Sequence, residues 1–200
     1  MRLALRAGRS FGVAVARKMV YRGHVVTNVE GCDAAVRNWW LEEYPDGPGD
    51  EGYDLLVMAH HHGWIADADI EAATVGAVGY HPSLLPRHRG RDAVRWTVHM
   101  GDPIAGGTVY RLTEGAKEAD AGPIVWQGWC HVRPGWSASD LWREELFPMG
   151  VRMLADLVPS GEWPERIQLK ATRSRLEDAE DQDERLATWE PAFDRPPLSS

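Results

Sequence analysis

VGAVGYHPSLLPRHRG, residues 75–90, joins a small apolar run directly to a polar loop bounded by prolines. Residues 75–80 are typical of a strand, and Pro82 and Pro86 restrict the backbone of the loop that follows it. In open α/β sheets, ligands bind at the carboxyl ends of strands, so this loop is where we expect chemistry. His81 stands at the junction and titrates near neutrality, as proton transfer requires.

On both sides of this segment, short apolar runs alternate with amphipathic runs of helical length, from Arg2 to about Pro134. This alternation predicts parallel β-α units in an α/β domain. Further strands are expected over residues 3–8, 24–29, 53–59, 106–112 and 124–132. Helices are expected over residues 11–21, 34–44, 70–73, 92–100 and 140–147.

Polar residues mark where these helices begin. Ser10 and Asp33 are the expected N-caps of the first two helices, Gly23 ends the first, and either Asp67 or Asp69 caps the short third one. Two further signals flank the last helix: the S-x-x-D pattern of Ser137 and Asp140 predicts its start, and Pro148 is expected to kink or interrupt it.

The composition excludes several classes of protein. The 200 residues carry 22 Lys and Arg against 30 Asp and Glu, a net charge of −8, which argues against a broad surface for nucleic acid or anionic membranes. The sequence holds neither a long apolar span nor a signal-peptide pattern, and its two cysteines cannot make a disulfide framework. We therefore expect a soluble, cytoplasmic protein.

The segment EADAGPI, residues 118–124, supplies a second candidate for chemistry. Asp120 precedes small residues that let a backbone approach a ligand closely. A carboxylate beside an imidazole can orient the ring, raise its pKa or accept a proton through a water. Asp120 and His81 alone are a weak signal, and their surroundings carry the inference.

Three motifs occur in a fixed order: HPSLLPRHRG (81–90), GDPIAGGTVY (101–110) and DAGPIVWQ (120–127). Together they resemble the folate-dependent formyltransferase family, which includes enzymes that act on glycinamide ribonucleotide, methionyl-tRNA and nucleotide sugars. The resemblance covers about residues 53–157. It implies a Rossmann-like, mostly parallel sheet flanked by helices, with a catalytic domain over residues 1–160 and a short polar extension over residues 161–200.

The resemblance also implies a reaction and a set of site residues. An amine would attack the formyl carbon of 10-formyltetrahydrofolate, the donor. His81 would stabilise the oxyanion or shuttle a proton, and Asp120 would position His81 and a relaying water. The pteridine would lie against residues 62–65 and the loop from Glu114 to Asp120. The implied cofactor-binding residues are His62, Gly63, Trp64, Ile65, Ser83, Leu84, Leu85, Pro86, Glu114, Gly115 and Ala116.

The sequence departs from the family pattern at one catalytic position. The family has N-x-H-x-S-L-L-P, and here Gly79 stands where the pattern has Asn. That amide donates to the formyl oxygen, and losing one such donor typically costs ~10²–10³ in rate. Three explanations remain open: His60, His61 or His62 replaces the amide; the fold performs altered or slow chemistry on a folate or related ligand; or the site has lost catalysis and serves binding or assembly.

Two polar clusters have alternative interpretations. The run His60 to His62 could hold a metal through at most two of its rings, since consecutive strand residues face opposite ways. No ligand at recognised spacing accompanies it, so we expect no metal. The basic residues Arg87, His88, Arg89 and Arg91 could attract the glutamate tail of a folate or an acceptor phosphate, or simply form a solvated loop.

The acceptor follows by elimination. The turn AGRSFG, residues 7–12, could expose N–H groups to an anion, but it lacks the phosphate-binding G-x-G-S-N pattern of the glycinamide ribonucleotide branch. The chain after Ser160 is acidic, which counts against tRNA. A small amine remains, such as an amino sugar nucleotide, without nucleic-acid or membrane partners. The alternatives are a 10-formyltetrahydrofolate hydrolase and a non-catalytic folate- or nucleotide-binding module.

Four tryptophans could stack on a base or sugar, although core packing is favoured for each: Trp39, Trp40, Trp126 and Trp129.

Overall fold

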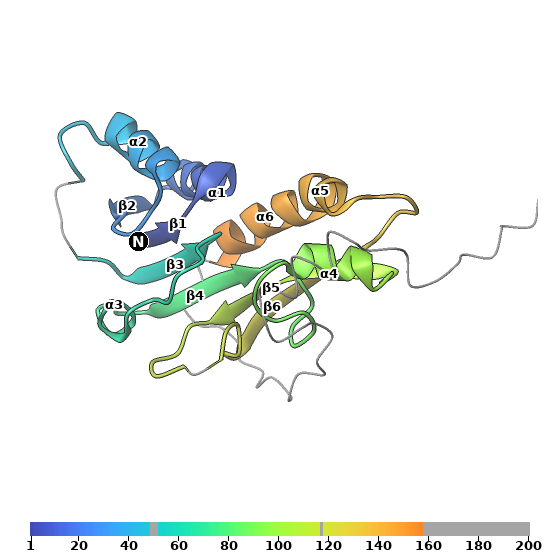
Figure 1. The fold of residues 1–200 in the computed structure, drawn as a ribbon. Coiled ribbons are helices and arrows are strands. Elements are labelled where there is room, and N and C mark those ends of the chain that lie inside the picture. Colours follow the sequence, from blue (N-terminus) through green and yellow to red (C-terminus); the bar gives the residue numbers. More distant parts are fainter. Residues whose placement is uncertain (49–51, 117, 158–200) are drawn as a thin grey trace, which may run out of the picture.

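A computed structural model describes residues 1–48, 52–116 and 118–157 and contains one six-stranded sheet in the order β2-β1-β3-β4-β5-β6 (Figure 1). The strands are β1 (Arg2–Ala7), β2 (Val25–Asn28), β3 (Leu55–Ala59), β4 (Gly76–His81), β5 (Ile104–Arg111) and β6 (Ile124–His131). The helices are α1 (Arg9–Tyr21), α2 (Ala34–Glu43), α3 (Asp67–Glu71), α4 (Ala93–His99), α5 (Ala138–Leu141) and α6 (Phe147–Leu157), with one π-helical turn, η1 (Trp142–Leu146), between the last two.

Strands β1 to β4 pair in parallel, as the alternating pattern predicts. This confirms a mostly parallel sheet flanked by helices. The prediction of parallel units as far as Pro134 is wrong for the last two strands, because β5 runs antiparallel to β4 and β6 antiparallel to β5. A parallel connection needs a crossover, usually a helix, and none of the described residues between β5 and β6 forms one.

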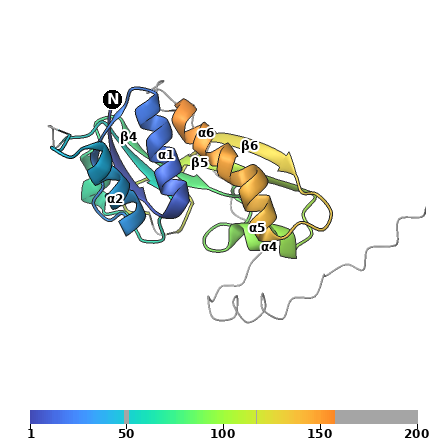
Figure 2. The same ribbon diagram turned by 90° about the horizontal axis from the view of Figure 1, so that it is seen from above.

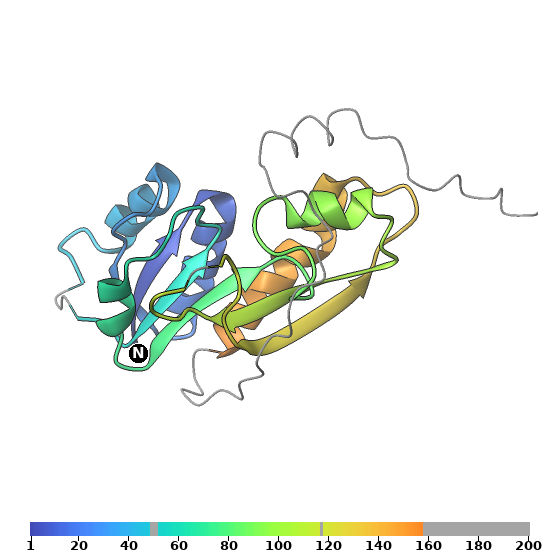
Figure 3. The same cartoon turned by 60° about the horizontal axis from the view of Figure 1, so that its bottom comes forward.

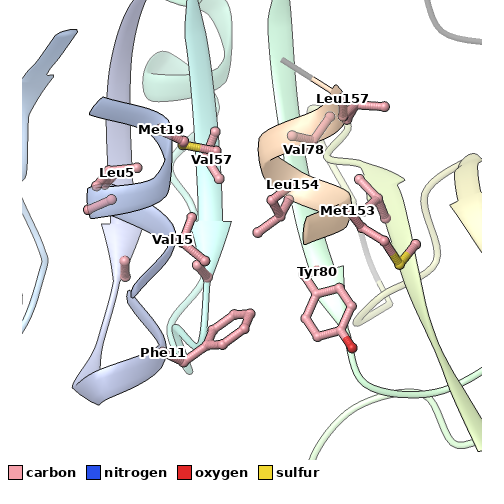
Figure 4. Close-up of a cluster of buried hydrophobic side chains, with 14 of the residues drawn as sticks. Leu5, Phe11, Val15, Met19, Val57, Val78, Tyr80, Met153, Leu154 and Leu157 are labelled. Atoms are coloured by element: carbon pink, nitrogen blue, oxygen red, sulfur yellow. The ribbon is translucent and has the colours of Figure 1, made fainter. Parts of the chain in front are cut away.

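The main core lies between the sheet and the two long helices α1 and α6, which run side by side across one face (Figure 2). The sheet contributes Val57, Val78 and Tyr80 to this core (Figure 4). From the helices come Phe11, Val15, Met19, Met153 and Leu154. This burial anchors β4, and with it the strand end that carries His81.

The opposite face of the sheet holds a smaller apolar cluster with the short α3 beside it (Figure 3). Arg6, on β1, is 4% exposed. Its guanidinium lies 3.0 Å from the carboxylate of Asp69 in α3 and also donates to Asn28 Oδ1 at 2.8 Å. A buried charge needs such partners. The ion pair therefore ties α3 to the first strand.

The predicted N-cap of α1, Ser10, is wrong, because Asp33 bonds to the first N–H of that helix from elsewhere in the chain. α1 begins at Arg9 with Gly8 as its N-cap, so Ser10 lies inside the helix. Asp33 caps α2, as predicted, by accepting from the Val36 N–H, and its other oxygen accepts from the Arg9 N–H at 2.6 Å. One carboxylate therefore satisfies donors at the starts of two helices.

The expected cap of α3 is also corrected. Ala66 is the N-cap, and neither Asp67 nor Asp69 caps the helix. Asp67 Oδ1 instead accepts from the Gly115 N–H at 3.0 Å. Asp69 pairs with Arg6. Both carboxylates are used in long-range contacts that local sequence does not reveal.

The C-terminal helices confirm one predicted cap and show how the helix accommodates Pro148. Ser137 and Asp140 form the predicted capping box at the start of α5. Pro148 does not end the helix: η1 precedes it, and α6 continues to Leu157. Proline has no N–H to donate to the preceding turn, and the wider π turn accommodates that loss.

Among the described residues, no helix is long and apolar enough to cross a membrane. The predicted extension, residues 161–200, lies outside the described residues.

Candidate functional site

His81 is the last residue of β4 and is 6% exposed. Its Nε2 lies 2.8 Å from the carbonyl oxygen of His88, and its Nδ1 lies 3.2 Å from Asp120 Oδ2. A carbonyl oxygen can only accept, so Nε2 carries the hydrogen of that bond. The nitrogen free to gain or lose a proton is therefore Nδ1, which faces the carboxylate.

Asp120 is held on both of its oxygens. The Tyr110 hydroxyl donates to Oδ1 at 2.6 Å, and the Gly90 N–H donates to Oδ2 at 2.7 Å. Its backbone has a left-handed φ of 53°, and its side chain is 13% exposed. The structure thus brings together the two residues predicted as catalytic, from β4 and from the turn before β6, with a fixed carboxylate beside the imidazole.

The loop after His81 is built around Thr108 of β5. The Thr108 hydroxyl donates to the Ser83 carbonyl at 2.6 Å and accepts from the Leu85 N–H at 3.1 Å. Gln127 of β6 donates to Thr108 Oγ1 and to the Leu85 carbonyl. Thr108 and Gln127 were not predicted, because only the strand pairing brings them to the loop.

These bonds decide what the predicted loop residues do. Ser83 and Leu85 are buried, and the Ser83 hydroxyl donates to the Arg87 carbonyl at 2.6 Å. Leu84 is half-buried and packs over Gly106, where a Cβ would collide with it. Pro86 follows a cis peptide bond. In this structure the side chains of Ser83 and Leu85 shape the loop, and their contact with a cofactor stays a prediction.

The two loops predicted to hold the pteridine lie close together. Asp67, just after residues 62–65, accepts from the Gly115 N–H at 3.0 Å. His62, Gly63 and Trp64 are exposed, as are residues 114–116, whereas Ile65 is half-buried against the smaller apolar cluster. An open groove of about 470 Å³ is lined by residues 70–71, 73–77 and 111–114. It lies toward the start of β4, away from His81, and shares Glu114 with the predicted loop.

Gly79 faces space that two side chains already fill. A Cβ built on Gly79 would lie 2.8 Å from the Met58 methyl and 3.1 and 3.2 Å from two ring carbons of Tyr110. Gly79 and Tyr110 stand opposite each other in the pairing of β4 with β5. The space that a side chain at residue 79 would enter is therefore already occupied by an apolar methyl group and an aromatic ring.

The basic residues after the loop are largely paired within the protein. Arg87 makes two bonds to the Asp102 carboxylate, at 2.5 and 2.7 Å, and the buried His88 ring lies 2.8 Å from it. Burial raises the pKa of Asp102, but hydrogen bonds from His88 and Arg87 outweigh it and hold the pKa below the ordinary range. Arg89 pairs with Glu118 at 3.2 Å, and Arg91 is exposed. The predicted anion-attracting patch is thus mostly an internal ion-pair network.

A family model described as formyl transferase matches residues 36–148, which is more than half of the chain. The chain belongs to the formyl transferase family. The matched residues include β3, β4, the loop after His81, β5, β6 and the Asp120 turn.

Among curated relatives of this formyl transferase, the mitochondrial 10-formyltetrahydrofolate dehydrogenase of Mus musculus is 36% identical over 118 residues. The match covers 59% of the chain and 12% of that relative. A methionyl-tRNA formyltransferase of Lactobacillus delbrueckii is 29% identical over 134 residues, covering 62% of the chain and 41% of that protein. The chain thus spans only a small part of the dehydrogenase.

Solved structures with low sequence identity share the fold. The formyltransferase PseJ from Anoxybacillus kamchatkensis, in complex with UDP-4,6-dideoxy-4-formamido-L-AltNAc and tetrahydrofolate, superposes with a TM-score of 0.65 at 16% identity. That match covers 96% of this chain and 95% of PseJ. HypX from Aquifex aeolicus in complex with tetrahydrofolic acid gives a TM-score of 0.61 at 20% identity, covering 85% of this chain and 28% of HypX.

The histidine run from His60 to His62 is not part of the immediate surroundings of Gly79. The three atoms nearest to the Cβ position belong to Met58 and Tyr110. His60 packs its ring against His62 and Trp142, with ring centroids 5.1 and 5.9 Å apart. Burial lowers the pKa of His60. Within the described part of the chain, no group of three or more His, Cys, Asp or Glu side chains is arranged to hold a metal.

The structure also describes two further candidate contacts, the turn at residues 7–12 and the four tryptophans, for which core packing was favoured. At the turn, the Asp33 carboxylate accepts from the Arg9 N–H, so one donor of this helix start is already bonded. Trp39 is buried and the Trp40 indole donates to the Val26 carbonyl, so both belong to the packing of α2. Trp126 and Trp129 lie on the edge strand β6 and are 38% and 64% exposed.

Proposed function

We propose that this formyl transferase moves the formyl group of 10-formyltetrahydrofolate to the amine of a small-molecule acceptor. The observation that carries the proposal is the His81 imidazole at the end of β4, with Nδ1 3.2 Å from Asp120 Oδ2. A titratable pair at the carboxyl edge of a parallel sheet is where this fold places chemistry. Family membership and two structural neighbours solved with tetrahydrofolate support the choice of donor.

The geometry suggests how the protons move. The amine nitrogen forms a bond to the formyl carbon, and the formyl oxygen becomes an oxyanion. The proton lost by the amine reaches the Asp120 carboxylate, directly or through a water, and can pass to Nδ1 of His81. The resulting imidazolium stabilises the oxyanion. The oxyanion then re-forms the carbonyl, the carbon–nitrogen bond to the folate breaks, and the folate nitrogen takes the proton from the His81 imidazolium.

Residues 62–65, 83–86 and 114–116 are the proposed walls of the folate site. The first and last of these segments are exposed and are linked through Asp67 and Gly115. Small residues such as Gly63 and Gly115 leave backbone groups accessible to the edge of a pteridine ring. Residues 1–160 would form the catalytic unit, and the activity would be cytoplasmic, consistent with two unpaired cysteines.

An amino sugar nucleotide is the acceptor class we favour. PseJ, solved with a formamido sugar nucleotide, matches nearly the whole chain in fold. The net charge of −8 makes tRNA a poor partner. The Asp33 carboxylate accepts from the first N–H of α1, and its negative charge disfavours a phosphate of the acceptor at that helix start.

Hydrolysis of 10-formyltetrahydrofolate is the second candidate, because water can replace the amine as the nucleophile in the same site. Without an amide at position 79, the site has one fewer donor to the formyl oxygen whichever nucleophile attacks. A water attacking the same carbon would release formate and need no acceptor pocket. A folate- or nucleotide-binding module without turnover is the non-enzymatic alternative.

One preparation can separate these functions. Titration calorimetry with a stable 10-formyltetrahydrofolate analogue measures donor binding, and assays for formyl-amine and formate then follow turnover against a panel of amino sugar nucleotides. Formyl-amine supports transfer, formate without acceptor supports hydrolysis, and binding without product supports the module. No binding would overturn the folate assignment.

Two variants test the named residues. His81→Ala and Asp120→Asn should each abolish turnover and leave analogue affinity within about threefold, because both side chains are proposed to act on the reacting atoms and the proton, while other residues hold the folate. His131→Ala, which removes an exposed histidine on β6, is the matched control and should be active. Normal turnover in either test variant would remove that residue from the mechanism.

A further inference from the structure

Tyr110 is a buried tyrosine whose hydroxyl points into the candidate site. It lies on β5, is 3% exposed, and pairs directly with Gly79 on β4. Its hydroxyl donates to Asp120 Oδ1 at 2.6 Å. Nothing in the local sequence links residue 110 to residue 120, so Tyr110 was not predicted as a site residue.

We propose that Tyr110 is a positioning residue that holds the Asp120 carboxylate in line with Nδ1 of His81. This inference rests on the proposed function of the site. Asp120 Oδ2 receives the Gly90 N–H and faces His81, and Tyr110 engages only the other oxygen, Oδ1. Two donors on two different oxygens fix both the place and the rotation of the carboxylate plane.

The hydroxyl acts through Asp120 and does not replace the missing amide. A phenol has a single hydrogen to donate, and here that hydrogen is directed at Asp120. Burial raises the pKa of Tyr110 well above its ordinary value, and the Asp120 charge adds to the shift. The phenol therefore stays protonated and keeps donating across the physiological pH range.

Gly79 is what admits this tyrosine. The Tyr110 ring lies 3.1 and 3.2 Å from the Cβ position of residue 79, closer than an ordinary side-chain contact. Any side chain there would press the ring and move its hydroxyl relative to Asp120. Gly79 and Tyr110 therefore form a matched pair: a residue without a side chain at position 79 leaves room for the ring that supports the carboxylate.

Tyr110→Phe removes only the hydroxyl, and Tyr80→Phe is its matched control. Tyr80 is also a buried tyrosine, next to His81 on β4, but it faces α6 and donates to the Leu146 carbonyl at 2.8 Å. In Tyr110→Phe we expect kcat to fall about ten- to hundredfold, the cost of a slightly misplaced catalytic group. KM for the folate donor should change less than about twofold. Tyr80→Phe should leave both constants near wild type.

A spectroscopic measurement makes the test independent of turnover. The ¹⁵N signals of the His81 imidazole should shift in Tyr110→Phe and match wild type in Tyr80→Phe. Unchanged His81 signals, or a kcat close to wild type in Tyr110→Phe, would overturn the proposal. If Tyr110→Phe fails to fold, Tyr110→Leu provides the same loss of the donor and must show the same shift.

The two proposals can fail separately. A wild-type protein that binds no folate analogue and turns nothing over refutes the proposed function. The His81 signals of the two tyrosine variants still decide whether Tyr110 positions the pair.

Discussion

Replacing Gly79 by alanine should destabilise the protein and disturb the site. The added methyl group would lie 2.8 Å from the Met58 methyl and 3.1 Å from the Tyr110 ring. The Met58 methyl ends a flexible side chain and can move aside. The Tyr110 ring is held by its bond to Asp120 and can move only by weakening that bond.

The magnitude follows from two opposing effects. Overpacking a core by one methylene-sized group costs about 1–3 kcal/mol. Alanine regains about 0.5–1 kcal/mol relative to glycine, because it restricts the unfolded chain. The net loss is about 0–2.5 kcal/mol, which for a chain of this length lowers Tm by up to about 10 °C.

A double-mutant cycle with Met58→Ala tests the cause of this loss. Removing the closest methyl opens the space, so Gly79→Ala should cost at least about 0.5 kcal/mol less in that background. Urea unfolding gives the free energies, and the formyl-transfer assay shows whether activity falls with the Tyr110 contact. A higher Tm for Gly79→Ala, or strict additivity with Met58→Ala, would refute the packing argument.

Three further predictions concern the scaffold. Arg6→Leu should lower the free energy of unfolding by about 1–3 kcal/mol. This is less than the loss of a fully buried ion pair would cost, because the Asp69 side chain is 32% exposed. A variant that unfolds in urea with the stability of wild type would contradict this prediction. Asp33→Ala should lower the free energy of unfolding by about 0.5–2 kcal/mol at pH 7. The Arg9 N–H holds the pKa of Asp33 below its ordinary value, so the stabilising contribution of the carboxylate is complete above about pH 4 and is lost as the pH falls through the lowered pKa. A stability difference from wild type that persisted at pH 2 would exclude the carboxylate as its source. Burial raises the pKa of Cys32 and of Cys130 to about 11. Iodoacetamide at pH 8 should therefore label neither thiol until urea is added. Rapid labelling of the folded protein, detected by mass spectrometry, would contradict the buried placement of the two thiols.

The fold was predictable where local pattern and strand pairing agree. The apolar runs that became β1, β3 and β4 are buried on both faces, and such runs stand out in sequence. The direction of β5 was not predictable, because an apolar run carries no information about the strand beside which it will lie. The start of α1 was mispredicted for a similar reason: Asp33, 23 residues after Ser10 in sequence, supplies the oxygen that a local cap would have provided.

Of the side chains that meet at the end of β4, the sequence predicted two, His81 and Asp120. Both stand in motifs that are recognisable in the sequence. Tyr110, Thr108 and Asp102 were missed, since each contributes through the pairing of β5 or through a turn far along the chain. The partner of Arg87 and His88 was not predictable either, because the Asp102 carboxylate that both of them contact lies 14 to 15 residues further along the chain.

The support of the loop after His81 has a consequence for protein engineering. The side chains that hold its backbone, Thr108 and Gln127, come from the antiparallel strands, whereas its first residue comes from the parallel half of the sheet. A designer who grafted only residues 81–90 onto another α/β scaffold would lose every one of those anchors. The smallest transferable cassette is β4 together with the loop, β5 and β6.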